Sequence, residues 1–228
     1  MRNEKFDAII LAAGVGRRFI SSIPKQYIEI HSKSLIDIAI EKITDTKKIN
    51  NIVVVINKHN SYKLPSKFSS IFLVNGGNTR TKSVYNGLKF IMKCNNHEKN
   101  VIIHDAARPC IEKKDIMKLL DQCNSLKTGL SLGYPLTNAL KMTNKNLIVK
   151  DNIKRDNLYM SFTPQVYNYS KLFDAYSDII KKKIQVDDEI EAMSLRNHKV
   201  KIIKSSVGNI KLTYKDDLET ITALMKKI

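Results

Sequence analysis

The sequence has 228 residues, of which 43% are hydrophobic and 27% charged, enough for one α/β domain with its own core. No apolar run approaches the roughly 18 to 20 residues of a membrane span, nothing near Met1 resembles a secretory signal, and three cysteines without CxxC spacing signal neither a disulfide framework nor a zinc site. The net charge of +17 indicates an acidic partner, but the lysines are spread along the whole chain. Charge alone does not choose among nucleic acid, a membrane surface and a polyphosphate substrate, but the even spread of the lysines disfavours nucleic acid. We expect a cytoplasmic protein whose partners are small-molecule substrates, with no nucleic acid and no membrane.

Apolar runs of strand length alternate with helical patterns along most of the chain. Helical spacing is clear at Val84, Leu88 and Ile91, whereas the strand candidates are continuous Val, Ile and Leu runs typical of strands buried on both faces. In chain order the predicted elements are strand 6–11, helix 35–43, strands 52–56 and 71–74, helix 84–92, strand 101–103, helix 116–123, strand 130–132, helices 170–180 and 187–195, strands 200–203 and 210–213, and a final helix. This alternation predicts an α/β fold with a mostly parallel sheet flanked by helices.

The segment 134–162 interrupts the alternation. It is polar, rich in Asn and Lys, and holds one short apolar run at 147–149. We therefore predict that 134–162 leaves the sheet as a β-arm, within a single domain of residues 1–228.

The first predicted strand runs into a turn of small residues, LAAGVGRR at 11–18, which is followed by PKQ at 24–26. Small residues let backbone N–H groups approach phosphate oxygens closely, and Arg18 and Lys25 add positive charge. The turn is neither of two familiar phosphate loops, because GxxxxGK[ST] is missing and Phe19 stands where a dinucleotide fingerprint needs a third small residue. It indicates either a phosphate-binding loop or an ordinary strand-to-helix turn with solvated arginines.

A second glycine turn, GGNTRTKSV at 76–84, lies between a predicted strand and a predicted helix. Main-chain donors and acceptors in such a turn can bind the edge of a base, with Arg80 and Ser83 facing a ligand from the helix start. The alternative is a plain turn with an N-cap.

A third motif, HDAARP at 104–109, follows an apolar strand, which is where open α/β sheets place their ligands. An acid and an arginine there suit a metal ion or an anionic substrate. The alternative is a local ion pair between Asp105 and Arg108. His104 is more typical of a structural histidine than of a base or a ligand, so we assign it no role.

Taken in order, six motifs resemble those of the 2-C-methyl-D-erythritol 4-phosphate cytidylyltransferases. They are LAAGxGxR, PKQ, GGxxRxxSV, HDAARP, TPQ and NIKxT, and they span roughly 7–224. The resemblance implies a Rossmann-like nucleotidyltransferase fold, dependence on Mg²⁺, and a homodimer whose β-arms interlock. It also implies transfer of the cytidylyl group from CTP to methylerythritol phosphate, with release of pyrophosphate, in the non-mevalonate route to isoprenoids.

The resemblance also assigns site residues by position. Three of them, Arg18, Lys25 and Lys211, would be the catalytic residues. Arg18 and Lys25, with Mg²⁺, would neutralise charge on the reacting phosphates, and Lys211 matches a position that binds methylerythritol phosphate. The residues expected to bind CTP are Ala12, Ala13, Gly14, Gly16, Gly77, Asn78, Arg80, Ser83 and Ala106. Those expected to bind the acceptor are Asp105, Arg108, Arg155, Thr163 and Asp187, with Asp105 also a ligand of Mg²⁺ and Arg155 reaching into the partner's site from the arm.

Two alternatives stay open. A ribitol-5-phosphate cytidylyltransferase of the same superfamily would share the CTP chemistry, but those enzymes tend to have LAGG in the first loop and to lack the AAR of the third motif. Ala139 and Asp187 stand where the methylerythritol family often has threonine, and both positions concern the acceptor. A basic nucleic-acid-binding module would predict salt-sensitive binding of DNA and no turnover of CTP, yet with 7% aromatic residues no stacking platform stands out.

Overall fold

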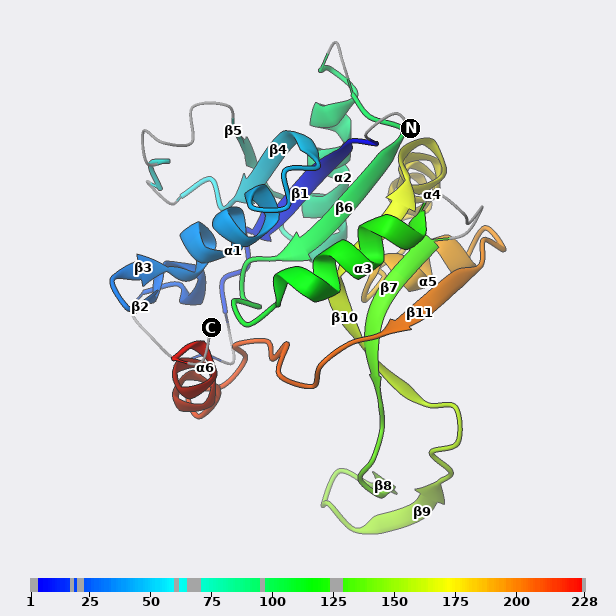
Figure 1. Ribbon diagram of the computed structural model, residues 1–228. Coiled ribbons are helices and arrows are strands. Elements are labelled where there is room, and N and C mark those ends of the chain that lie inside the picture. The colour runs from blue at the N-terminus through cyan, green and yellow to red at the C-terminus, as the bar shows by residue number, and fades with distance from the viewer. Residues whose placement is uncertain are drawn as a thin grey trace.

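The computed structural model describes residues 4–16, 19, 23–59, 62–64, 71–94, 97–123 and 129–226. In this part of the chain seven strands form one sheet, in the order β11-β7-β10-β6-β1-β4-β5 (Figure 1). Their bounds are β1 Phe6–Ala12, β4 Ile49–Ile56, β5 Ile71–Asn75, β6 Asn100–Asp105, β7 Gly129–Pro135, β10 Tyr159–Asn168 and β11 Val200–Lys204.

Among these strands, β10 runs antiparallel to both of its neighbours, β6 and β7. The other neighbouring pairs are parallel. Parallel strands are buried on both faces, which explains why Val53, Val54 and Val55 in β4 are all fully buried. The carboxyl ends of the parallel strands lie at one edge of the sheet, so the loops after β1, β4, β5 and β6 meet there.

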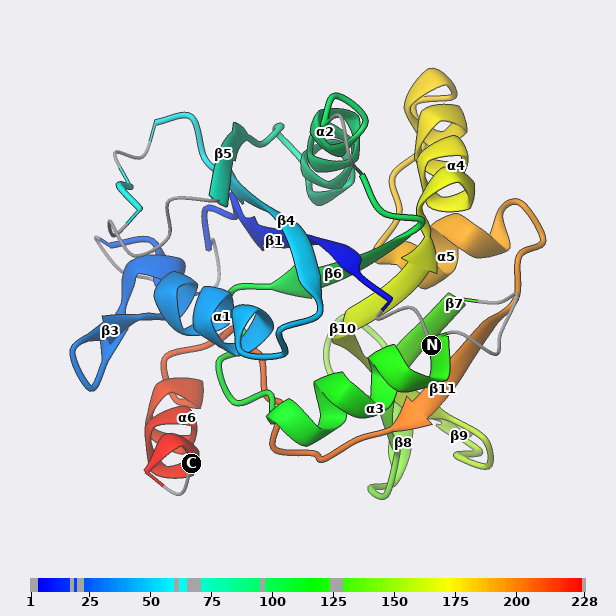
Figure 2. The ribbon, with the colours of Figure 1, turned by 45° about the horizontal axis from the view of Figure 1, so that its top comes forward.

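Helices cover both faces of the sheet (Figure 2). One face carries α1 Leu35–Thr44 and α3 Lys113–Cys123, and the other carries α2 Arg80–Ile91, α4 Tyr169–Lys181 and α5 Glu189–Ser194. Each layer has its own core, because successive residues of a strand point to opposite faces. Ile10 packs with Ile36 and Ile40 of α1, whereas Ile9 packs with Leu88 of α2. The predicted fold class is confirmed.

The prediction of a strand at 210–213 is wrong. The segment is irregular chain that leads from β11 to the last helix, α6 (Asp217–Met225). Its alternating apolar pattern arises because Leu212 is buried with Ile221 of α6 in a third core, while Ile210 packs against the same core. The Leu212 N–H donates to the Ala107 carbonyl, 2.8 Å away in the loop after β6, so the backbone is bonded to a loop and not to a strand edge.

Between β1 and α1 the described chain forms a short 3₁₀ turn, η1 (Lys25–Tyr27), and a small ribbon of β2 (Glu29–Ile30) and β3 (Lys33–Ser34). The 3₁₀ turn holds two residues of the PKQ motif, which is thereby fixed beside the first loop.

The predicted β-arm is an antiparallel hairpin of β8 (Leu140–Thr143) and β9 (Val149–Ile153). It continues β7 and β10 and stands away from the sheet in Figure 1. Its turn exposes apolar side chains, with Leu147 82% and Ile148 62% accessible. None of the described helices is both long and apolar enough to cross a membrane.

Candidate active site

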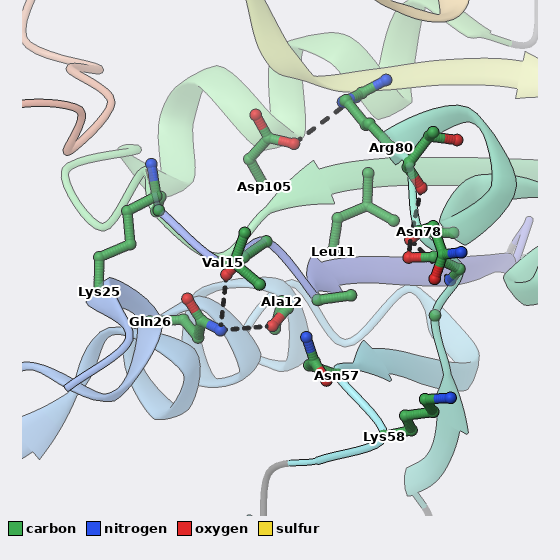
Figure 3. A pocket seen from close by; sticks show the side chains of 18 of the residues that line it. Leu11, Ala12, Val15, Lys25, Gln26, Asn57, Lys58, Asn78, Arg80 and Asp105 are labelled. Atoms are coloured by element: carbon green, nitrogen blue, oxygen red, sulfur yellow. Dashed lines mark hydrogen bonds and ion pairs between the residues drawn. The ribbon is translucent and has the colours of Figure 1, made fainter. Parts of the chain in front are cut away.

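A cavity of about 830 Å³ lies at the carboxyl edge of the sheet (Figure 3). The three loops predicted to bind ligands all contribute to it. Its walls are formed by 11–16 after β1, 57–59 after β4, 76–80 after β5, and by Lys25, Gln26, Ser83, Asp105, Ala107, Lys211 and Thr213. The cavity therefore gathers segments that are up to 202 residues apart, from Leu11 to Thr213.

The first loop is fastened by Gln26, whose side chain is 2% exposed. Its Nε2 donates to the carbonyls of Ala12 and Gly14 at 2.8 and 3.2 Å, as Figure 3 shows. Gly16 has φ +63°, a conformation that favours glycine. The sequence places Gln26 in the PKQ motif but indicates no role for it. In the structure Gln26 fixes the geometry of the first loop, on which phosphate binding would depend.

Replacement of Gln26 by leucine is expected to raise the KM for CTP about tenfold, because the carbonyls of Ala12 and Gly14 lose their shared donor and the loop loosens. Steady-state kinetics at varied CTP would measure this. Gln122→Leu, at a half-buried residue of α3 that does not line the cavity, serves as the matched control for loss of an amide. An unchanged KM for CTP in a folded Gln26→Leu enzyme would contradict the role of Gln26.

The second loop packs tightly against the first. A Cβ on Gly76 would lie 2.5 Å from the Ala13 Cβ, so only glycine allows this approach. Ser83 braces the turn, since its hydroxyl accepts a bond from the Gly77 N–H at 3.1 Å and donates to the Thr79 carbonyl at 2.9 Å. Thr79 in turn caps α2, as the side chain accepts from the Lys82 N–H.

Asp105, the last residue of β6, lies among three cations. Its Oδ2 is 2.6 Å from Lys211 Nζ and 4.0 Å from Arg108 Nε, and its Oδ1 is 3.5 Å from an Arg80 nitrogen. Burial alone would raise the pKa of this carboxyl, but the attraction of Lys211, Arg80 and Arg108 outweighs burial and holds the pKa far below the usual 3.8. Asp105 is therefore a permanent anion that keeps the cations together.

Arg108 and Thr163 lie behind Asp105. Arg108 Nη1 donates to the Asn209 carbonyl at 2.8 Å, and its guanidinium lies 5.2 Å from the centre of the Phe162 ring. The Asp105 N–H donates to the Thr163 hydroxyl at 3.0 Å, and Asn209 Nδ2 donates to the Thr163 carbonyl at 2.9 Å. One hydrogen-bond network thus joins three motifs, HDAARP, TPQ and NIKxT. None of these motifs predicts the network alone.

Lys25 connects the two ends of the chain, since its Nζ donates to the Leu212 carbonyl at 2.6 Å. Ala106 is buried after β6, with its N–H bonded to the Leu11 carbonyl at 3.0 Å. Asn78 lines the cavity. Predicted residues from both the CTP group and the acceptor group therefore lie in or beside one cavity.

Three predicted residues are not among those brought together. Arg18 lies outside the described residues. Arg155 is in the arm, where its guanidinium donates to the Thr137 carbonyl. Asp187 is exposed just before α5, and its N–H donates to the Glu191 carboxylate at 2.7 Å. Neither Arg155 nor Asp187 lines the cavity of its own chain.

Asn57, Lys58 and His59 line the cavity but belong to no motif, so sequence reasoning missed them. The signal available was their position directly after a parallel strand, β4. A metal cage is not formed, because the described part of the chain holds no group of three or more His, Cys, Asp or Glu side chains suited to a metal ion.

His104 is fully buried in β6, with Nδ1 3.4 Å from the Thr163 hydroxyl oxygen. Burial lowers its pKa from the usual 6.5 to about 4, since a charged imidazole would be desolvated there; Asp105 opposes the shift and Arg108 adds to it. The imidazole is therefore neutral at pH 7, in keeping with a structural histidine.

His104 should make the fold sensitive to mild acid. The folded state disfavours the protonated ring. The neutral imidazole therefore contributes fully to the stability of the fold above pH 6.5, and this contribution is lost as the pH falls toward about 4. Between pH 7 and 5 the free energy of unfolding of the wild type should fall by about 2 kcal/mol more than that of His104→Gln. Calorimetry should show this as an extra fall in Tm of about 4 to 8 °C. His31→Gln, at an exposed histidine, is the control. Equal losses in wild type and His104→Gln would show that the ring is not held neutral.

Comparisons with known proteins point to one family. A model of the 2-C-methyl-D-erythritol 4-phosphate cytidylyltransferase family matches residues 6–227. The 2-C-methyl-D-erythritol 4-phosphate cytidylyltransferase of Vibrio vulnificus is 32% identical over 214 residues, which cover 92% of this chain and 90% of that protein. Its counterpart in Wigglesworthia glossinidia brevipalpis is 35% identical over 213 residues, covering 92% and 91%. The crystal structure of the Francisella tularensis enzyme of that name is similar with a TM-score of 0.81 at 30% identity, covering 96% of this chain and all of that one (100%). The chain therefore belongs to the 2-C-methyl-D-erythritol 4-phosphate cytidylyltransferase family.

Proposed function

We propose that the cavity binds CTP and 2-C-methyl-D-erythritol 4-phosphate side by side and joins them. Family membership makes the chain a CTP-dependent cytidylyltransferase of the non-mevalonate isoprenoid pathway, and the proposal concerns how its residues act. The observation that carries it is that Lys25, Lys211, Arg80 and Asp105 line the same cavity as the glycine loop. The proposal includes a cytoplasmic location, because CTP is a cytoplasmic metabolite.

CTP would lie along the first two loops. The backbone of 12–16 would bind the triphosphate together with Lys25 and, from outside the described residues, Arg18. The turn at Gly77 and Asn78, braced by Ser83 and flanked by Arg80, would bind the cytosine, with Ala106 near the nucleoside. This arrangement is supported by the close packing of the two loops at Gly76.

The acceptor would bind beside Asp105. Lys211 and Arg108 would hold its phosphate and Asp105 its hydroxyl groups, with Thr163 fixing the backbone of Asp105. Asp187 of the same chain and Arg155 of a second copy would complete this half of the site. These assignments follow the family positions and are supported by the network that joins Asp105, Thr163 and Lys211.

The reaction then needs no covalent intermediate with the protein. An oxygen of the acceptor's phosphate attacks the α-phosphorus of CTP, and a new P–O bond forms while the bond to the bridging oxygen of the β-phosphate breaks. The electron pair leaves with pyrophosphate, and no proton transfer is required. The side chains contribute positioning and neutralisation of charge on the phosphoryl oxygens.

Mg²⁺ enters the proposal as a companion of CTP. Asp105 is the one carboxylate among the described residues that line the cavity. Mg²⁺ is commonly held by substrate phosphates and water with one or two carboxylates, so this donor set fits an ion carried mainly by the triphosphate, with Asp105 as its protein ligand. When bound, the ion would neutralise charge on the reacting phosphates.

We also propose that two copies associate through the arm at 134–162. The support is the arm's exposed apolar tip, where Leu147 has φ 61°, an uncommon backbone conformation for a bulky residue, and is followed by Ile148 and Val149, 62% and 54% exposed. Such a surface is stabilised when a second copy covers it.

Leu147→Asp combined with Ile148→Asp is expected to convert the dimer to a monomer, because burying two carboxylates in an apolar contact is costly. Sedimentation equilibrium would measure the mass. Val207→Asp, which also replaces an apolar side chain about half exposed, serves as the control. A dimer that persists in the double variant would remove the arm from the interface.

The reaction is tested by following pyrophosphate release from CTP and Mg²⁺ with either methylerythritol phosphate or ribitol 5-phosphate. Release with methylerythritol phosphate alone is the expected result. Release with ribitol 5-phosphate alone would keep the CTP site and the mechanism but reject the acceptor, and would direct attention to Ala139 and Asp187. No release with either acceptor, together with salt-sensitive binding of DNA, would reject the enzyme altogether.

A further inference from the structure

Glu189 is a buried carboxylate at the start of α5 for which the reaction described above gives no role. Its side chain is 0% exposed. Arg80 donates to both of its oxygens, from Nη1 at 2.8 Å and from Nη2 at 3.0 Å, and the Tyr176 hydroxyl donates to Oε1 at 3.1 Å. Glu189 is therefore fully bonded, and its main partner is a residue on the wall of the cavity.

The same guanidinium faces Asp105. Arg80 Nη2 is 3.5 Å from Asp105 Oδ1, which is longer than its 3.0 Å bond to Glu189, and Lys211 occupies Asp105 Oδ2 at 2.6 Å. Charges of alternating sign thus follow one another from Lys211 through Asp105 and Arg80 to Glu189. In this series Arg80 lies closer to the interior carboxylate, that of Glu189, than to the carboxylate of Asp105, which lines the cavity.

Stability alone is a poor explanation for such a pair. Removing two charges from water costs about as much as their attraction returns, so a buried ion pair is weak evidence for stabilisation. A guanidinium and a carboxylate that meet through two parallel bonds do fix direction, however. Without Glu189, the nearest carboxylate for Arg80 is Asp105, and a two-bond pair there would occupy the lone pairs needed by Lys211 and by a substrate.

We propose that Glu189 is a positioning residue that holds Arg80 back from Asp105, so that Asp105 stays open to Lys211 and to the acceptor. Tyr176 keeps the Glu189 carboxylate in place. This inference rests on the proposed function, because it takes Asp105 as the residue that binds the acceptor. It predicts a defect that is larger for the acceptor than for CTP, since Arg80 only flanks the turn assigned to the cytosine and the CTP phosphates are assigned to the first loop.

The test replaces Glu189 by glutamine in the full-length enzyme. The KM for methylerythritol phosphate should rise about tenfold, while the KM for CTP changes less than about threefold. Glu219→Gln makes the same change at an exposed residue of α6 that does not line the cavity, and should leave both constants unchanged. Tyr176→Phe keeps the buried ring and removes one hydrogen bond, so it should give a smaller acceptor-specific rise, about threefold.

A second measurement does not depend on turnover. In a crystal structure of Glu189→Gln, Arg80 should lie about 2.8 Å from Asp105, the length of a direct charge-assisted bond. The proposal is overturned if Arg80 keeps its present distance and the acceptor KM is unchanged, or if both KM values rise equally, which would mean that Glu189 supports Arg80 generally. If the wild type fails to use methylerythritol phosphate, the proposed function fails, and the distance from Arg80 to Asp105 still decides the role of Glu189.

Discussion

Replacing Lys25 with methionine should lower kcat about 10² to 10³-fold, as expected for loss of one charged group that stabilises developing negative charge. The methionine side chain keeps much of the length and apolar body of lysine and loses only the ammonium. Lys25 lines the cavity beside the glycine loop, so its charge is placed where the triphosphate would lie. Quenched single-turnover measurements of CTP consumption with saturating acceptor would report the chemical step.

Two further variants make the result for Lys25 specific. Lys89→Met removes an exposed lysine on α2 and should leave kcat unchanged. Lys25→Arg keeps the charge but not the compact ammonium, so it should recover part of the rate. If Lys25→Met retains wild-type kcat while its melting temperature falls, the bond from Lys25 to the Leu212 carbonyl is structural, and another cation neutralises the phosphates.

Asp105→Asn should lower kcat/KM for the acceptor about 10² to 10³-fold while CTP still binds. The amide keeps the shape of the carboxylate but leaves Lys211, Arg80 and Arg108 without their shared anion. Removing one partner of a buried charge pair costs about 3 to 5 kcal/mol, so the variant should also unfold more easily. Calorimetric titration with CTP and steady-state kinetics with the acceptor would separate the two half-sites.

Loss of stability alone could imitate the Asp105 result, and two further variants distinguish the causes. Asp7→Asn removes another fully buried aspartate, at the start of β1 and away from the carboxyl edge, and should lower stability without changing the acceptor KM. Asp105→Asn combined with Lys211→Met should be more stable than Asp105→Asn alone, because one uncompensated cation is gone. A simple sum of the two single effects would mean that the 2.6 Å contact carries no coupling.

The sequence was sufficient for the elements whose pattern is local. The Val and Ile runs of β1 and β4 and the helical spacing of α2 are determined by residues within one element, and the structure confirms them. The pattern at 210–213 misled because Ile210 and Leu212 alternate like a strand but bury their side chains against α6. An alternating apolar pattern shows only which side chains are buried. The rest of the fold decides whether a neighbouring strand is available for pairing.

The candidate site divides in the same way. Motifs directly after strands, such as Asp105 after β6, could be placed at the carboxyl edge because parallel strands share it. The partners of Gln26 and Glu189 could not, since these depend on contacts across 14 and 109 residues that the local sequence does not encode. The roles of Arg155 and Asp187 depend on a second copy or on bound substrate, so they stay predictions.

Two cations proposed to act in the site, Lys25 and Arg108, donate hydrogen bonds to carbonyls of one segment, those of Leu212 and Asn209. A carbonyl oxygen accepts hydrogen bonds as a phosphate oxygen does but carries only a partial charge, so in the proposed site these two carbonyls would stand in for substrate oxygens. They would hold the two cations in place before a phosphate binds, which would lower the reorganisation cost of the proposed reaction. The irregular backbone at 205–213 is well suited to this purpose, because carbonyls in a strand ladder would already be committed to their neighbours.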